Sequence, residues 1–190
     1  LEAYERFLNL GGKLSNEGIR QAYQTVGHPI FALAEQWSIN VNKTIASIPL
    51  EDRLPFPHVY ETVEAIYAVA DIAVVSSANN AAVTAEWEQA GLIKFVNGIF
   101  TQENGSKKQI LASLKQTGGY HNGCILKLGD APGDLQAAQS NAVFFYPIIP
   151  EKEAESWLEF KDTYLPLFID GRYAECEQKL IDRFYSELED

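Results

Sequence analysis

The spacing of hydrophobic positions changes once along the chain, near residue 54. Before that point the apolar side chains recur only at helical intervals, without any alternating β-branched run. Beyond it, helical stretches alternate with short, strongly apolar runs. The runs are residues 71–77, 93–100, 124–129 and 142–149. The helical stretches beside them are residues 59–70, 80–92, 106–118 and 132–141.

Short apolar strands separated by helices are typical of parallel βαβ units that are covered on both faces. The sequence therefore predicts an α/β fold with a parallel sheet. Residues 152–168 and 173–188 add two amphipathic C-terminal helices. The first of them has aromatic residues at helical spacing, which favours core packing over a stacking surface. These aromatic residues are Trp157, Phe160, Tyr164 and Phe168.

Three prolines between residues 49 and 57 mark a break in the pattern, which we interpret as a domain boundary. It divides the chain into a helical unit, residues 1–53, and an α/β core with the C-terminal helices, residues 54–190.

Composition narrows the range of partners and locations. The chain has 190 residues, a formal net charge of −11 and a pI of about 4.7. Binding to nucleic acid or to an anionic membrane needs a basic surface, so neither is expected as a partner. Cys124 and Cys176 are too few for a disulfide framework, and no apolar stretch approaches the ~20 residues that span a bilayer. We therefore expect a cytoplasmic protein with a small-molecule partner; the sequence does not indicate its oligomeric state.

Polar residues that follow the strands are the candidate site, because open parallel sheets bind ligands beyond the carboxyl ends of their strands. Ser76 and Ser77 follow the first strand, and Asn79 or Asn80 can cap the next helix. A hydroxyl beside the free N–H groups of a helix start can bind an anion. The alternative is that these residues only cap the helix and form the turn.

Two lysines occupy an unusual position. Ser106 is a candidate N-cap, which places Lys107 and Lys108 in the first helical turn. Cations there oppose the helix dipole at a cost of about 0.3–1 kcal/mol each, so we expect one of them to have an anionic partner. The alternative is a solvated lysine that extends away from the helix axis.

Two acids lie at the last strand-to-helix junction, in "KLGDAPGD". Asp130 ends the strand, Pro132 suits the first helical turn, and Asp134 follows near the third helical position. Helix capping could account for one acid, but two acids flanked by glycines favour a bound cation. One or two carboxylates, completed by water and phosphate, are the usual ligands of Mg²⁺.

A hydroxyl, a lysine and an acid pair thus follow successive strands. This ordered set resembles the haloacid dehalogenase superfamily of phosphohydrolases, over residues from about 54 to 150. The second, third and fourth motifs of that superfamily are matched by "IAVVSS", "GSKKQIL" and "LGDAPGD". The resemblance implies a Rossmann-like parallel sheet core, and the helical residues 1–53 resemble the cap that many members insert after their first strand.

The resemblance also implies a role for each matched residue. Ser76 would hydrogen-bond a phosphoryl oxygen, helped by the N–H of Ser77. Lys107, or the lysine after it, would neutralise charge between nucleophile and phosphate. Asp130 would hold Mg²⁺ together with Asp134, which would act directly or through water. The implied function is a Mg²⁺-dependent phosphohydrolase of a small phosphorylated metabolite.

The first motif of the superfamily is absent from these 190 residues. It is an Asp-x-Asp on the central strand, whose first Asp becomes an aspartyl-phosphate and whose second acts as general acid and base. In the family fold this strand lies between the strands that end at Ser76 and Gly129. An open slot there would leave backbone groups unpaired, so we expect the nucleophile on a strand upstream of Leu1.

Two alternatives remain. The first is a non-catalytic binding or regulatory relative that lacks the nucleophile. The second is phosphomutase or dehalogenase chemistry on the same scaffold. The acid pair argues against dehalogenation, because hydrolysis of a carbon–halogen bond needs no Mg²⁺.

Overall fold

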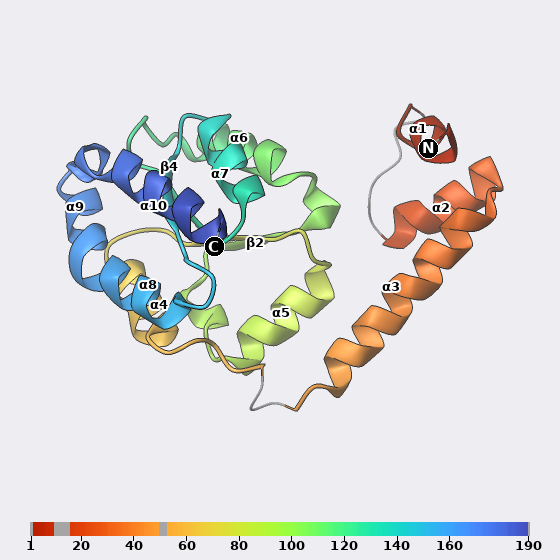
Figure 1. The fold of residues 1–190 in the computed structure, drawn as a ribbon, viewed down its shortest axis with the longest axis horizontal. Helices are drawn as coiled ribbons and strands as arrows, with labels where there is room; N and C mark the ends of the chain where they lie inside the picture. Colours follow the sequence, from red (N-terminus) through yellow and green to blue (C-terminus); the bar gives the residue numbers. More distant parts are fainter. Residues whose placement is uncertain (1, 10–15, 50–52, 190) are drawn as a thin grey trace.

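The computed structural model describes residues 2–9, 16–49 and 53–189. Its first three helices are α1 (Glu2–Asn9), α2 (Asn16–Val26) and α3 (Pro29–Ser47). They pack around Phe7, Ala22 and Phe31 and stand to one side of the remaining chain (Figure 1). The predicted boundary of this unit falls beside residues 50–52, which lie outside the described ranges. The division into a cap and a core therefore stays a prediction.

The rest of the chain alternates helices and strands, as the sequence predicts. The helices are α4 (Val59–Tyr67), α5 (Asn80–Gln89), α6 (Lys107–Gly118), α7 (Pro132–Gln139), α8 (Glu153–Glu159), α9 (Leu165–Ile169) and α10 (Glu177–Glu189). The strands are β1 (Ala73–Val75), β2 (Gly98–Phe100), β3 (Leu126–Gly129) and β4 (Phe144–Pro147). No helix in the described ranges has both the length and the apolar character needed to cross a membrane.

Both strand pairs formed by the described residues are parallel, which confirms the predicted strand direction. β1 pairs with β2 in the register Val74 to Ile99, and β3 pairs with β4 in the register Leu128 to Tyr146. The predicted strand over residues 93–100 is too long. Its first part, Ile93–Phe95, forms a 3₁₀ turn that buries Phe95 in an apolar cluster with residues of α4.

The single parallel sheet that the sequence predicts is found only in part. Within the described residues the strands form two separate two-stranded sheets, β1 with β2 and β3 with β4. Strands that are neighbours in a sheet lie about 4.8 Å apart and share hydrogen bonds. No described segment pairs in this way with the second edge of β1 or of β3. The molecule is thus a mixed α/β protein, and the Rossmann-like sheet stays a prediction.

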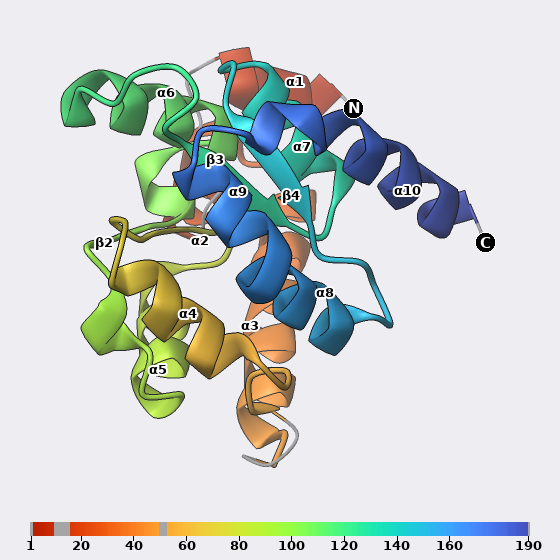
Figure 2. The same ribbon diagram turned by 90° about the vertical axis from the view of Figure 1, so that its left-hand side faces the viewer.

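The main core surrounds β3 and β4, which Figure 2 shows in the middle of the molecule with helices around them. Leu135 of α7, Phe145 of β4 and Phe184 of α10 belong to one buried cluster. A second cluster contains Tyr146 of β4 and Phe160. The helices of the core therefore cover β4 with apolar side chains from both of these clusters.

The predicted helix over residues 152–168 is interrupted. A π-helical turn, Phe160–Tyr164, separates α8 from α9, and Pro166 follows it in the first turn of α9. Proline has no N–H to donate and disrupts a continuous helix, which accounts for the break. Phe160 and Tyr164 lie against Tyr146, with ring centroids 4.8 and 5.3 Å apart, so their predicted role in core packing is confirmed.

Candidate functional site

The carboxyl end of β1 holds two serines in different environments. The N–H of Ser76 donates to the carbonyl of Phe100 at 2.9 Å, and its hydroxyl accepts from the N–H of Ala78 at 3.1 Å. Ser77 is exposed, and Asn79 caps α5 by accepting from Ala82. Part of the polar character of this segment is therefore used in turn formation and capping, which was the alternative interpretation of its sequence.

The start of α6 agrees with the sequence. Ser106 is the N-cap and forms a reciprocal capping box with Gln109, so Lys107 and Lys108 lie in the first turn. The Lys107 ammonium contacts both carboxylate oxygens of Asp134, at 2.8 and 2.9 Å. Asp134 is thus the anionic partner that the position of the lysines predicts. Lys108 is exposed and forms no ion pair with any described residue.

Asp134 comes from the first turn of α7. Pro132 opens this helix, and Ala131 precedes it without a side-chain cap, so Asp134 occupies the predicted third position. The side chain of Asp134 is 2% exposed. Its carboxylate accepts from the Lys107 ammonium, and Nζ of Lys127, on β3, lies 3.0 Å from its Oδ1. One carboxylate therefore joins two ammonium groups from different elements, which simple helix capping does not account for.

Gly129 makes room for this arrangement. A Cβ added at Gly129 would lie 2.4 Å from the Cβ of Asp134 and 2.6 Å from its Cγ, which no real side chain tolerates. At Gly133, one residue before Asp134, an added Cβ would meet nothing within 4 Å. The glycine at the end of β3 is thus required by the close approach of Asp134 to the strand.

The charges in this cluster influence one another. Burial would raise the pKa of Asp134, but the adjacent Lys127 and Lys107 outweigh burial and hold that pKa below its usual value. Burial also lowers the pKa of Lys127, an effect that Asp134 opposes. Asp134 is therefore ionised at neutral pH, and its carboxylate has two lysine partners, Lys107 and Lys127.

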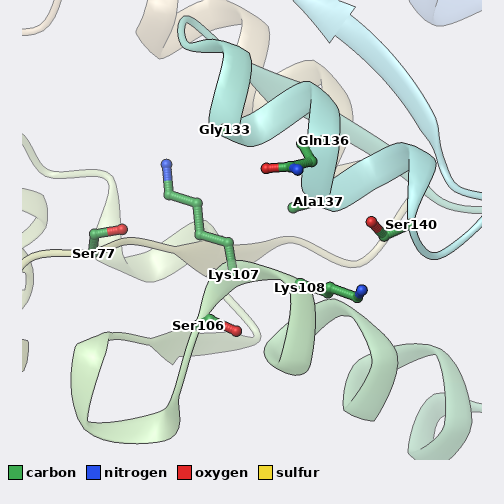
Figure 3. A pocket seen from close by; sticks show the side chains of 8 residues that line it. All are labelled: Ser77, Ser106, Lys107, Lys108, Gly133, Gln136, Ala137 and Ser140. Carbon is green, nitrogen blue, oxygen red and sulfur yellow. The ribbon is translucent and has the colours of Figure 1, made fainter. Parts of the chain in front are cut away.

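A pocket of about 370 Å³ lies beside the cluster. Its lining residues are Ser77, Ser106, Lys107, Lys108, Gly133, Gln136, Ala137 and Ser140. Figure 3 shows that Lys107 extends toward the start of α7, whereas Lys108 points toward Ser140. The described residues that line the pocket provide hydroxyl, amide and ammonium groups, and none of them carries a carboxylate, so the pocket suits an anionic ligand.

The acid pair is divided between two environments. Asp130 follows β3 and is exposed, whereas Asp134 is buried and held by the lysines. Among the described residues there is no group of three or more His, Cys, Asp or Glu side chains that could hold a metal ion. Mg²⁺ needs only one or two carboxylates when water and phosphate supply the remaining ligands, so Asp130 fits such an ion, with Asp134 four residues away.

Lys127 is the site residue that sequence reasoning missed. It lies in the predicted apolar strand, between Leu126 and Leu128, which both contact the aromatic cluster around Tyr146. Alternate residues of a strand face opposite sides, so Lys127 points away from that cluster. The available signal is the single charged residue inside a strand that is expected to be buried. A buried charge needs a partner of opposite charge.

Comparison with known proteins identifies a family. A family model described as haloacid dehalogenase-like hydrolase matches residues 5–147 of the chain. The match begins within α1 and spans α2, α3, both strand pairs and all the candidate site residues. Neither the curated proteins nor the solved structures contain a match to this chain.

Proposed function

Because this chain belongs to the haloacid dehalogenase-like hydrolase family, we propose that it is a Mg²⁺-dependent phosphohydrolase of a small phosphorylated metabolite. The observation that carries the proposal is the contact between Lys107 and Asp134 at the edge of a pocket that Ser77 also lines. It brings together residues that follow three different strands. Ammonium and hydroxyl donors without a lining carboxylate suit a phosphoryl group.

The side chains divide the work as follows. Lys107 donates to a phosphoryl oxygen and offsets negative charge as it develops during transfer. Ser76 and Ser77, at the end of β1, provide hydroxyl and backbone donors that orient the phosphoryl group. Preorganised donors of this kind supply most of the catalysis in phosphoryl transfer, because little covalent chemistry falls to the protein.

Asp130 would hold Mg²⁺ directly, and Asp134 would hold it directly or through water. The bound ion would neutralise phosphoryl charge and help to align the transferring group. Asp130 is the better placed of the two acids, because it is exposed and no lysine in the described ranges forms an ion pair with it.

We propose further that the nucleophile belongs to an aspartate on a strand that precedes Leu1. Among the described residues nothing pairs with the second edge of β1 or of β3, which supports this proposal, because an unpaired edge on an apolar strand leaves backbone donors and acceptors without partners. A strand that pairs with both edges would join the two sheets into one. It would also bring a carboxylate close to Ser76 and Asp130, where it could form an aspartyl-phosphate.

The direct test replaces Asp130 by Asn in the complete protein. We expect Mg²⁺-dependent hydrolysis of p-nitrophenyl phosphate to fall at least about 100-fold, while circular dichroism stays unchanged. The control is Asp170→Asn, an exposed acid at the end of α9, which should retain full activity. Unchanged turnover in Asp130→Asn would contradict the metal assignment.

A non-catalytic binding protein is the alternative, and the absence of Asp-x-Asp from the 190 residues is the observation that favours it. The codons upstream of Leu1 distinguish the two functions. An Asp-x-Asp at the end of a short apolar run, together with Mg²⁺-dependent turnover of some member of a phosphorylated-metabolite panel, supports the enzyme. Phosphate binding without turnover supports the binding protein.

A further inference from the structure

Lys127 lies in a position where a charge is costly. It is on β3, with a side chain that is 13% exposed, and its ammonium donates to the carbonyl of Leu128 at 2.8 Å. The same ammonium lies 3.0 Å from Oδ1 of Asp134. A buried cation is tolerated only with partners of this kind, so the strand, the carboxylate and the lysine form one unit.

Asp134 links this unit to the pocket. Its two oxygens accept from Lys107, which comes from α6, and its side chain packs directly over Gly129 at the end of β3. The Asp134 carboxylate therefore sets the position of the Lys107 ammonium, and Lys127 in turn holds this carboxylate in place. Three elements, α6, β3 and α7, meet at this one carboxylate.

The second lysine gives Asp134 a partner besides Lys107. If Lys107 were the only partner of Asp134, the charges of this ion pair would cancel, and the pair would attract an anion only weakly. With Lys127 present, the Asp134 carboxylate is shared between two lysines, at 2.8 Å from Lys107 and 3.0 Å from Lys127, so Lys107 is not its only partner. Lys127 itself does not line the pocket, so it acts on a ligand only through Asp134 and the Lys107 ammonium that Asp134 contacts.

We propose that Lys127 is a positioning residue for phosphate binding, which compensates the charge of Asp134 and thereby keeps Lys107 available to a phosphoryl group. This inference rests on the proposed function, since it concerns the same phosphate site. It assigns a role to a residue that lies outside the motifs of the resemblance.

The test measures binding of inorganic phosphate by calorimetry, in the complete protein with Mg²⁺ present. Lys127→Met keeps the length and apolar stem of the side chain and leaves Asp134 paired with Lys107, so the fold should persist. We expect phosphate to bind about tenfold more weakly. Lys127→Arg should restore binding to within about threefold of wild type. Lys179→Met, which removes an exposed lysine of α10, is the control for overall charge and should have no effect.

A double-mutant cycle separates positioning from a general loss of structure. If Lys127 acts through Lys107, adding Lys127→Met to Lys107→Met should weaken phosphate binding further by less than about twofold. The same tenfold loss in both backgrounds would overturn the proposal, and so would wild-type binding in Lys127→Met alone. Failure of the wild-type protein to bind phosphate would instead remove the proposed function together with this inference.

Discussion

The two strand pairs differ in depth of burial and in the chemistry at their carboxyl ends. β4 has three consecutive buried residues, and Phe145 and Tyr146 are almost completely inaccessible to solvent. In β1 and β2 only Val74 is buried, and each strand has three residues. β3 leads into a buried cluster of charges, whereas β1 leads into serines that are partly or fully exposed.

This difference indicates which part of the site is fixed by the described residues. The charged cluster at β3 rests on a sheet that apolar side chains from several helices enclose, so its geometry is set by packing. The serines at β1 rest on a shorter and less buried strand pair. The stability of the protein should therefore depend on β3 and β4 more strongly than on β1 and β2.

We expect the largest change in the free energy of unfolding when a side chain of a strand pair is truncated to Ala, which creates a cavity. Phe145→Ala should lower the free energy of unfolding by about 3–5 kcal/mol, because the ring is fully buried between α7 and α10. Ile99→Ala in β2 should cost only about 1–2 kcal/mol, since this side chain is half-buried. Urea denaturation of both variants measures the difference. Equal losses would contradict the contrast between the pairs.

A smaller effect is expected from a single methyl group at the carboxyl end of β3. Gly129→Ala forces a Cβ into the side chain of Asp134 and should cost about 1–3 kcal/mol. Gly133→Ala has open space around it and should leave stability unchanged or raise it slightly, because alanine favours the helix. Thermal unfolding distinguishes the two glycines, at about 2–4 °C per kcal/mol for a chain of this size. A normal melting temperature for Gly129→Ala would mean that Asp134 lies elsewhere.

The smallest effect concerns an acid that packs against β4. Glu177 accepts from the N–H of Phe145 at 2.8 Å, and burial raises the pKa of its carboxyl above the ordinary value of 4.5. A raised pKa favours the folded state at low pH, and that contribution is lost as the pH rises through the raised value. Glu177→Gln keeps an acceptor for Phe145 without the charge.

The variant should therefore gain a few tenths of a kcal/mol at about pH 8 and lose this advantage toward pH 5. Urea denaturation at the two pH values measures the change. A gain that is independent of pH would show that the charge of Glu177 is not the cause.

Local signals predicted the elements well. The predictions that Ser106 caps α6 and that Pro132 opens α7 are confirmed, because both depend on residues within one helical turn. The strand over 93–100 was too long, because burial of Phe95 against α4 outweighs the β preference of its neighbours. The interruption at Phe160–Tyr164 was missed, although Pro166 was available as a signal.

By itself the sequence determined the succession of strands along the chain and their parallel direction. It also determined where helices start and which polar residues follow each strand, since periodicity and capping are local properties. Only the tertiary structure decided that Lys107 rather than Lys108 meets Asp134, that Lys127 joins them, and that Asp134 is buried while Asp130 is exposed. These contacts join residues as far as 27 positions apart. They depend on how α6 and α7 pack beside β3, and spacing along the chain does not encode that packing.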